Sequence, residues 1–264
     1  MTFLQLLLIA VVQGITEFLP ISSSGHLILI PHLTNFPDQG PMIDVAVHVG
    51  SLLAIIIYFW RDVLGLAKGG FASIGIGKEP EQKRLFWWVV VGTIPAVAVG
   101  LFLKLGGYLE SFRITDLVAV NLIVYGLLLG AADRWGKQTK SYEDVTWRDA
   151  LLVGLAQAMA LIPGTSRSGS TMTMARILGY KRVEAARFSF LLAIPAVAGA
   201  GLLAALDLAE ASAQMQTDAL IAGALTFVAA FLTMAFLMNF LKKASMLVFV
   251  VYRVAMGIAL LAFF

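Results

Sequence analysis

The chain has 264 residues, of which 59% are hydrophobic and only 13% carry a charge. Soluble domains average about 25% charged residues, so the composition excludes a water-soluble globular protein and indicates a polytopic membrane protein. The absence of cysteine excludes disulfides, thiolate metal sites and cysteine nucleophiles, and the net charge of +3 lies mostly in short loops, where it reports membrane orientation and predicts no nucleic-acid partner.

The first apolar segment, 2–33, is interrupted by proline, glycine and serine in the run QGITEFLPISSSGHLIL (13–29). Proline and glycine break the hydrogen-bond ladder of a helix, so this segment is predicted to form a broken helix and not a continuous span. It lacks a basic start and a small-residue cleavage site, and it is therefore expected to belong to the mature protein and not to a signal peptide.

Six continuous apolar stretches come close to the roughly 20 residues that cross a bilayer. They lie near 45–60, 85–103, 117–133, 188–206, 219–240 and 246–264. The connections 61–84 and 134–149 are rich in lysine and arginine and are expected to be loops, whereas 207–218 contains acidic residues and no base. Positive-inside reasoning places the basic loops in the cytoplasm and 207–218 outside.

A second interrupted segment, 150–178, contains the run QAMALIPGTSRSGSTMTM (157–174) and matches the first segment. Four residues recur at one spacing, and the pairs are Gln13 with Gln157, Ser22 with Ser166, Ser24 with Ser168, and Gly25 with Gly169. The chain is therefore predicted to be a single membrane domain, 1–264, made by duplication, with a first repeat of 1–133 and a second repeat of 147–264.

Three full spans separate the two interrupted segments, and an odd number of crossings inverts one repeat relative to the other. We therefore expect an all-α integral membrane protein with six transmembrane helices and two re-entrant helix hairpins that enter from opposite faces. Irregular backbone at membrane depth is tolerated only inside protein or beside a watery cavity. Inverted repeats with broken helices place a binding site where the repeats meet.

The tips of the two hairpins carry the residues that can do chemistry. Each tip precedes a new helix, whose free N–H groups and positive dipole end attract anions. Arg167 adds a charge that is costly in a bilayer and usually functional there. The polar candidates are Glu17, Ser22, Ser23, Ser24 and His26 in the first tip and Thr165, Ser166, Arg167, Ser168, Ser170 and Thr171 in the second.

Structural explanations compete with this prediction of a phosphate site. A break rich in serine and glycine also serves helix packing in membranes. Glu17 and Arg167 would form an ion pair without a catalytic role, and His26 would be a buried histidine with its hydrogen bonds satisfied.

Outside the tips, two further polar residues stand in apolar spans. His48 follows Asp44 by four positions, which predicts a pairing within one helix. Arg253 lies in the last span, where it either neutralises a partner or reaches the cavity.

The runs QGITEFLPISSSGH (13–26) and PGTSRSGST (163–171) resemble the motifs of the undecaprenyl-pyrophosphate phosphatase family, also known as bacitracin-resistance proteins. The resemblance covers essentially the whole chain, including FLLAIP (190–195) and VYR (251–253). It implies hydrolysis of undecaprenyl pyrophosphate to the monophosphate at the outer, periplasmic face of the bacterial inner membrane. This reaction recycles the lipid carrier for peptidoglycan and other wall polymers and gives bacitracin resistance.

The resemblance also implies a divalent cation, Mg²⁺ or Ca²⁺, for which Glu17 is the candidate ligand. Gln13 occupies the first position of the motif and is the weaker candidate, because its side chain is an amide and not a carboxylate. An amide oxygen contributes no charge to the binding of a cation.

For pyrophosphate hydrolysis, Arg167 is expected to neutralise the equatorial phosphate oxygens. Ser23 is the predicted nucleophile and His26, three positions further on, its base. Glu17 would orient His26 or bind the cation. Direct attack by water, with His26 or Glu17 as base, fits the residues equally well, and Ser23 then becomes a phosphate ligand. The other predicted substrate ligands are Ser22, Ser24, Thr165, Ser166, Ser168, Gly169 and Thr171.

A transporter is the rival class, because inverted repeats with broken helices near the midplane are also a transporter architecture. Such a protein would flip a polyprenyl phosphate, and the tip residues would bind and gate instead of catalysing. An ion channel is disfavoured by one arginine and many hydroxyls, which suit anion capture. Besides the polyprenyl lipid, the expected partners are membrane lipids, and the sequence also allows a homodimer.

Overall fold

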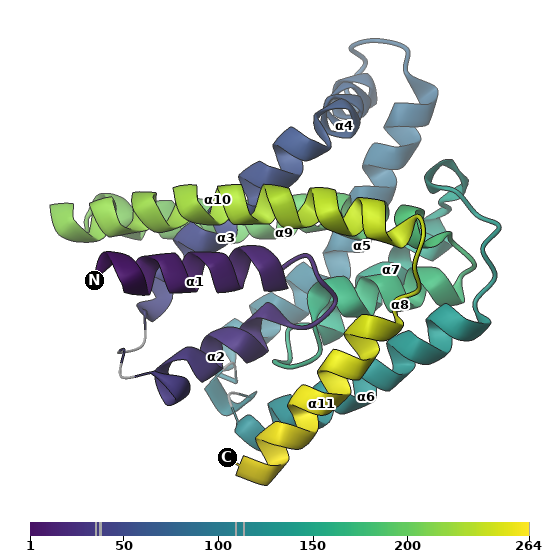
Figure 1. Ribbon diagram of the computed structural model, residues 1–264. Helices are drawn as coiled ribbons and strands as arrows, with labels where there is room; N and C mark the ends of the chain where they lie inside the picture. The colour runs from purple at the N-terminus through teal and green to yellow at the C-terminus, as the bar shows by residue number, and fades with distance from the viewer. Residues whose placement is uncertain (35, 37–38, 109, 113, 264) are drawn as a thin grey trace.

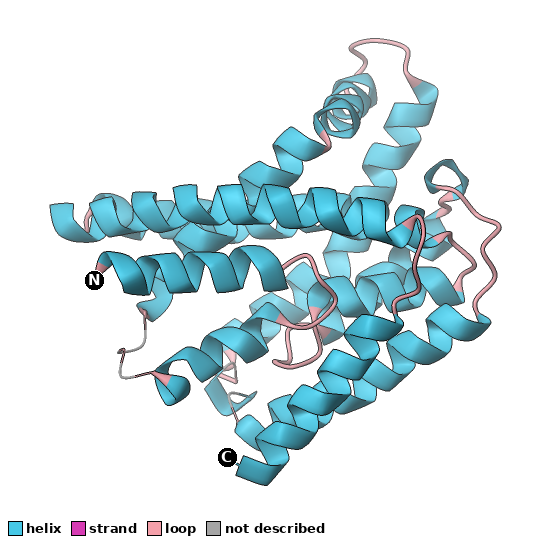
Figure 2. Cartoon of the chain, in the orientation of Figure 1, coloured by secondary structure: helices cyan, strands magenta, loops and turns pink. Residues whose placement is uncertain are grey.

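The computed structural model describes residues 1–34, 36, 39–108, 110–112 and 114–263, and this part of the chain contains helices and loops but no β-strand (Figure 2). The α-helices are α1 (Phe3–Thr16), α2 (Ser23–Leu33), α3 (Gly40–Tyr58), α4 (Trp60–Ser73), α5 (Pro80–Leu105), α6 (Thr115–Trp135), α7 (Trp147–Met159), α8 (Arg167–Ile177), α9 (Arg182–Ala209), α10 (Ala213–Leu241) and α11 (Leu247–Phe263). Two short 3₁₀ turns, η1 (Glu110–Phe112) and η2 (Tyr142–Asp144), complete the set of described elements.

Both interrupted segments are broken where the sequence predicts. In the first, α1 ends at Thr16 and α2 begins at Ser23. In the second, α7 ends at Met159 and α8 begins at Arg167. Pro20 stands in the first break, and Pro163 and Gly164 stand in the second, where the helical hydrogen-bond ladder stops. The chain therefore presents two irregular turns among otherwise continuous helices.

Four of the described helices, α3, α5, α6 and α10, are long and apolar enough to cross a membrane. Helices α1 and α11 are shorter apolar helices. The prediction that 61–84 is a loop is wrong, because α4 and the start of α5 occupy most of it. Residues 60–73 form α4, because Phe59 departs from helical geometry (φ −101°, ψ 31°) and a new helix starts directly after it. Helix α4 packs against α5, and Gly69 allows it, since a Cβ there would lie 2.1 Å from the carbonyl oxygen of Gln82.

Helices from the two halves of the chain pack against each other (Figure 1). Helix α10 lies along α3 and also against α1, while α5 lies along α7 and α6 along α11. Two of these approaches require glycine: a Cβ on Gly50 would lie 2.2 Å from the oxygen of Gly223, and one on Gly154 would lie 2.3 Å from that of Gly92. Small residues at such crossings allow backbones to approach closely. The halves are thus interleaved around the two irregular turns.

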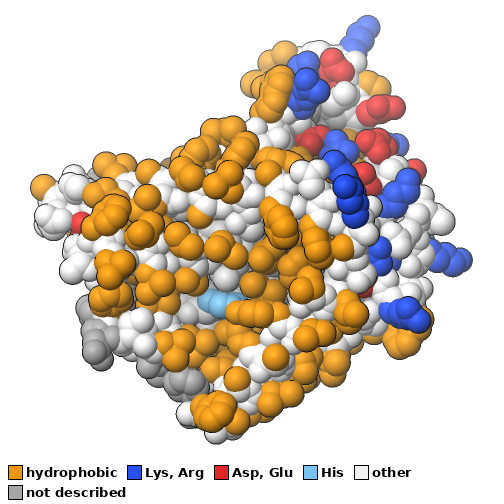
Figure 3. All heavy atoms as spheres, viewed as in Figure 1, with side chains coloured by type: hydrophobic (Ala, Val, Ile, Leu, Met, Phe, Trp, Pro, Cys, Tyr) orange, Lys and Arg blue, Asp and Glu red, His pale blue; other side chains and the backbone are white. Residues whose placement is uncertain are grey.

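Charged side chains gather at one end of the molecule. Figure 3 shows most of the visible Lys, Arg, Asp and Glu over α4 and the neighbouring loops, while hydrophobic side chains are scattered over the rest of the visible face and a histidine lies near its centre. At this end Asp133 is 5% exposed and accepts hydrogen bonds from Arg176 Nε (3.2 Å), Arg182 Nε (2.7 Å) and the backbone N–H of Met246 (3.0 Å). One carboxylate therefore ties α6 to α8, α9 and the start of α11.

Candidate active site

The two irregular turns have the same local geometry. Ser22 and Ser166 have φ angles of 76° and 71°, and they are the residues other than glycine with positive φ in the described part of the chain. Each serine caps the helix that follows, since its Oγ accepts a hydrogen bond from the N–H of Gly25 (3.4 Å) or Gly169 (3.1 Å). Strained backbone of this kind concentrates at functional sites. Both turns therefore aim a helix N-terminus, with its free N–H groups, into the same region.

The first helical residue after each turn reaches the same carboxylate. Ser23 Oγ donates to Glu17 Oε2 at 2.7 Å, and Arg167 Nη2 donates to Glu17 Oε1 at 2.7 Å. Glu17 is only 7% exposed. A buried carboxylate requires such compensation, because leaving it unpaired in an apolar medium costs several kcal/mol.

Two more side chains surround Glu17. Gln13, fully buried one turn earlier on α1, donates its Nε2 to Glu17 Oε2 at 3.0 Å. His48 on α3 places Nε2 3.7 Å from the same oxygen, and its Nδ1 lies 2.6 Å from the carbonyl oxygen of Asp44. The carboxylate is therefore held from four sides by a serine, an arginine, a glutamine and a histidine.

These groups open onto a cavity of about 390 Å³. Its polar lining residues are Glu17, Ser22, Ser23, Ser24, Asp44, His48, Ser166 and Arg167. Two buried polar atoms beside it have no hydrogen-bond partner among the described residues, Arg167 Nη1 and Gln13 Oε1. Buried polar groups are nearly always satisfied. An unsatisfied guanidinium nitrogen next to hydroxyls and helix N-termini is suited to bind an oxyanion such as phosphate.

The structure brings only some of the predicted substrate ligands to the cavity. Ser22, Ser24 and Ser166 line it, whereas Thr165, Ser168, Gly169 and Thr171 do not. Ser168 Oγ donates instead to the carbonyl oxygen of Leu19 (3.1 Å), which joins the two turns. Thr171 Oγ1 lies 2.6 Å from Ser189 Oγ on α9 and also reaches the carbonyl oxygen of Arg167. Ser168 and Thr171 therefore stabilise the second turn through contacts outside the cavity.

The arrangement predicted for His26 differs from the one observed. Its Nδ1 lies 2.7 Å from the carbonyl oxygen of Ser22, and its Nε2 lies 2.6 Å from the hydroxyl of Tyr252 on α11, with the two rings parallel at 5.6 Å. Both ring nitrogens are therefore engaged away from the cavity. Ser23 turns instead to Glu17, so the expected Ser23–His26 pair is replaced by a Ser23–Glu17 pair. Helical spacing places Ser23 and His26 on one face, but it does not determine which nearby group forms a hydrogen bond with each side chain.

Two polar residues that line the cavity, Asp44 and His48, were not predicted from the sequence as site residues. His48 and Asp44 belong to α3, and the spacing suggested only that they pair with each other. The ring of His48 does bond to Asp44, but through the backbone carbonyl, which leaves Nε2 free to face Glu17. A polar histidine inside an apolar span was the signal available for it.

Arg253 supports both turns from beneath. It is fully buried, and its guanidinium donates to carbonyl oxygens on both sides of the site. Nη1 reaches Pro20 (3.2 Å) in the first turn, and Nη2 reaches Gly164 and Thr165 (2.9 Å each) in the second. Nε donates to Leu122 on α6 (3.2 Å). A single guanidinium thus satisfies carbonyls that the helix breaks leave without partners.

The fold and the cavity together define a multi-pass helical membrane protein with a polar cavity between two serine-capped turns. The family model described as "Bacitracin resistance protein BacA" matches residues 6–259, and the chain belongs to this family. It is 69% identical to a protein of Erythrobacter litoralis named undecaprenyl-diphosphatase, over 100% of both chains. Proteins of the same name from Roseobacter denitrificans and Ruegeria pomeroyi are 47% and 48% identical, over 100% and 99% of this chain and 99% and 98% of the relatives.

Proposed function

We propose that the chain is an undecaprenyl-diphosphatase, which hydrolyses undecaprenyl diphosphate to undecaprenyl phosphate and inorganic phosphate. The observation that carries this proposal is the Ser23–Glu17–Arg167 arrangement, in which a nucleophile, a base and a cation with one free nitrogen meet in one cavity. The names of the full-length relatives support the same substrate. The product would return as lipid carrier for wall polymers, and the activity would give bacitracin resistance.

The chemistry follows from the positions of the three side chains. Ser23 Oγ attacks the terminal phosphorus while its proton passes to Glu17 Oε2, with which it is already hydrogen-bonded. The bond from phosphorus to the bridging oxygen breaks, and undecaprenyl phosphate leaves with the proton that Glu17 received, which restores Glu17 as a base. Water then attacks the phosphoserine and gives a proton to Glu17. The bond from phosphorus to Ser23 Oγ breaks, and the proton passes from Glu17 to Ser23 Oγ as phosphate is released. Arg167 Nη1 stabilises the charge on the transferred group in both steps.

Direct attack by water is the second route, with Glu17 as base and Ser23 as a phosphate ligand. The two routes differ in stereochemistry, because two in-line displacements retain the configuration at phosphorus and one inverts it. A substrate with a chiral terminal thiophosphate therefore distinguishes them. Retention, together with a phosphoserine trapped by acid quench, supports Ser23 as nucleophile, whereas inversion supports water.

The donor set of the cavity fits the divalent cation that the family resemblance implies. Mg²⁺ and Ca²⁺ prefer oxygen ligands, and Mg²⁺ is often held by one or two carboxylates together with substrate phosphates. Glu17 and Asp44 line the cavity, and Gln13 Oε1 is a buried oxygen with no partner among the described residues. Among the described residues, no group of three or more His, Cys, Asp or Glu is placed to hold a metal ion by itself, so the substrate would complete the site. A bound cation would neutralise charge on the phosphate oxygens.

The topology belongs to the same proposal. Six crossing helices would surround two re-entrant hairpins, α1–α2 and α7–α8, in inverted repeats of 1–133 and 147–264. The matching serine caps and the interleaved packing of α1 with α10 and α5 with α7 support this arrangement. With the basic end in the cytoplasm, the cavity would face the periplasmic side of the inner membrane. A homodimer stays a prediction, which native mass spectrometry in detergent would test.

Phosphate release from undecaprenyl diphosphate by purified protein in detergent, with Mg²⁺ or Ca²⁺, tests the function. Wild type should release phosphate and Arg167→Ala should lose nearly all of the activity. A folded wild type that binds the lipid but releases no phosphate would contradict the proposal. Transport of the lipid phosphate would then be the better explanation.

A further inference from the structure

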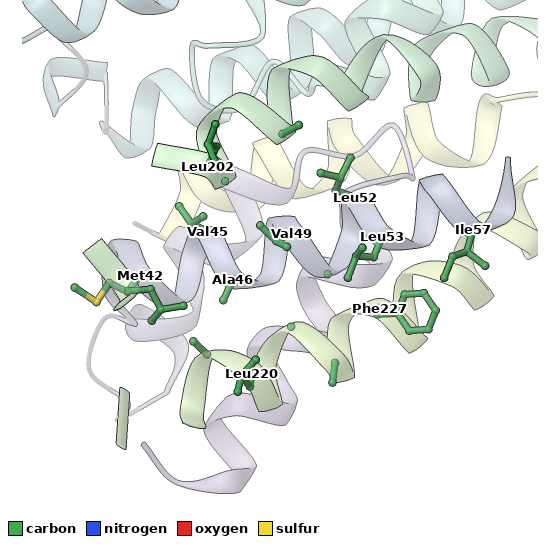
Figure 4. A pocket seen from close by; sticks show the side chains of 17 residues that line it. Met42, Val45, Ala46, Val49, Leu52, Leu53, Ile57, Leu202, Leu220 and Phe227 are labelled. Atoms are coloured by element: carbon green, nitrogen blue, oxygen red, sulfur yellow. The ribbon is translucent and has the colours of Figure 1, made fainter. Parts of the chain in front are cut away.

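A second, larger cavity lies beside the polar one. It has a volume of about 740 Å³, in the range of about 300–1,000 Å³ typical of ligand sites. All the side chains that line it are apolar, and they come from α3, α9 and α10 (Figure 4). Leu202 and Leu220 on its walls remain 71% and 73% exposed. The cavity is thus an apolar groove that opens sideways from the protein.

The groove continues into the candidate active site. Val45 of α3 and Gly201 of α9 line both the groove and the polar cavity. Gly201 stands where α9 meets α3, since a Cβ there would lie 2.8 Å from Val49 Cγ2. A side chain at position 201 would therefore narrow the junction. A molecule with a charged head and a long apolar chain could occupy both compartments at once.

The dimensions of the groove suit a long chain. Its walls on α3 extend from Met42 to Ile57, fifteen residues apart, which corresponds to about 22 Å along a helix. The hydrocarbon core of a bilayer is about 30 Å thick. The groove thus follows α3 through most of the membrane, and Phe227 of α10 lines it.

We propose that this groove between α3, α9 and α10 binds the polyprenyl chain of the substrate while the diphosphate occupies the polar cavity. The inference rests on the proposed function, adds where the lipid is recognised, and predicts that a long chain binds more tightly than a short one. Membrane lipids would contact any exposed apolar surface of the protein. Only the chain of a lipid whose diphosphate is bound in the polar cavity would enter the groove through the Val45–Gly201 junction. Burial of apolar chain here would contribute affinity in proportion to the area covered.

Small residues in the groove allow a direct test with two substrates. Ala198 and Ala224 line the groove and are exposed, so Ala198→Trp and Ala224→Trp should fill it without displacing the core. We expect KM for undecaprenyl diphosphate to rise at least about tenfold. KM for farnesyl diphosphate, whose short chain fills only the part of the groove nearest the junction, should rise less, with kcat for both substrates close to wild type. Ala259→Trp, at an exposed site on α11, is the matched control and should change neither KM.

Equal KM values of the groove variants and wild type for the long substrate would overturn the groove. If wild type releases phosphate from neither substrate, the proposed function is contradicted. Binding of the lipid in the groove is then tested by a second measurement. In that measurement, p-benzoyl-phenylalanine replaces Phe227 in the groove or Phe236, a 59% exposed residue on the same helix outside it.

We expect the photoreactive group at position 227 to crosslink to undecaprenyl diphosphate at substoichiometric concentration in detergent and lipid. Excess unlabelled undecaprenyl diphosphate should compete, and excess phospholipid should not. Position 236 should crosslink to bulk lipid without selectivity. Equal behaviour at the two positions would show that the groove is an ordinary lipid contact and would overturn the proposal.

Discussion

Glu17 and Arg167 meet at 2.7 Å although 150 residues separate them along the chain. Each belongs to one of two turns of the same geometry, and each turn has its own capping serine, Ser22 or Ser166. Arg167 is the first residue of α8, as Ser23 is the first residue of α2. The carboxylate accepts from both. Equivalent positions of the two turns thus present a serine hydroxyl and a guanidinium, and one glutamate accepts a hydrogen bond from each.

Replacing this carboxylate should abolish turnover without removing the fold. Glu17→Gln keeps the size of the side chain but removes the base, so kcat should fall by about 10²–10⁴. Phosphate release from undecaprenyl diphosphate measures it. Glu210→Gln, the same change at an exposed residue between α9 and α10, should be close to wild type. Retention of more than half the wild-type kcat by Glu17→Gln would exclude Glu17 as the base.

Lysine should not replace Arg167. The guanidinium uses Nη2 on Glu17 and leaves Nη1 for a phosphate oxygen, and an ammonium on a flexible stem does not reproduce this fork. We expect Arg167→Lys to lower kcat by about 10²–10³. Arg148→Lys, at an exposed site before the second turn, is the matched control. If Arg167→Lys behaves like this control, charge alone suffices and the free nitrogen is irrelevant.

The sequence predicted the elements of the site better than the contacts within it. The positions of both helix breaks were predicted correctly from proline, glycine and serine, because these residues act locally on the backbone. The tip residues Glu17, Ser23 and Arg167 were also predicted, since charge and hydroxyls in an apolar segment need an explanation. The broken segments could therefore be predicted from pattern alone.

Partner choice depended on distant packing and could not be predicted. His26 and Ser23 lie on the same helix, yet Nε2 of His26 forms a hydrogen bond with the hydroxyl of Tyr252 on the last helix. His48 enters the site only because α3 packs beside α1. Helix α4 was missed because it is shorter than a membrane span and contains Arg61, Asp62 and Lys68, although it packs on α5. Contacts between elements far apart in sequence decide each case.

The buried Asp133 cluster should matter for stability and not for catalysis. Asp133→Asn removes the carboxylate charge that pairs with the fully buried Arg176, and breaking a buried pair in this way costs about 3–5 kcal/mol. Thermal unfolding in detergent should shift strongly downward, while kcat of the remaining folded protein stays near wild type. Asp116→Asn, exposed at the opposite end of α6, should cost no more than about 1 kcal/mol. A clear loss of kcat with unchanged unfolding temperature for Asp133→Asn would contradict this separation.

A methyl group on Gly169 should separate helix stability from the alignment of the turns. Alanine is a better helix former than glycine by about 1 kcal/mol, so helix propensity alone predicts a more stable protein. The added Cβ would, however, lie 2.6 Å from Arg253 Nη1, the nitrogen that donates to Pro20 in the other turn. Because the guanidinium is fully buried and held by other carbonyls, it cannot move without releasing one of them.

We therefore expect Gly169→Ala to lower kcat by at least about tenfold, since a misplacement of about 1 Å costs on the order of 10²-fold in rate. Phosphate release and thermal unfolding in detergent measure the two effects on one sample. Gly65→Ala, in helix α4 with only ordinary contacts around its Cβ, provides the matched control and should keep kcat. Wild-type kcat with a raised unfolding temperature in Gly169→Ala would mean that the position of Arg253 does not set the alignment of Ser23 with Arg167.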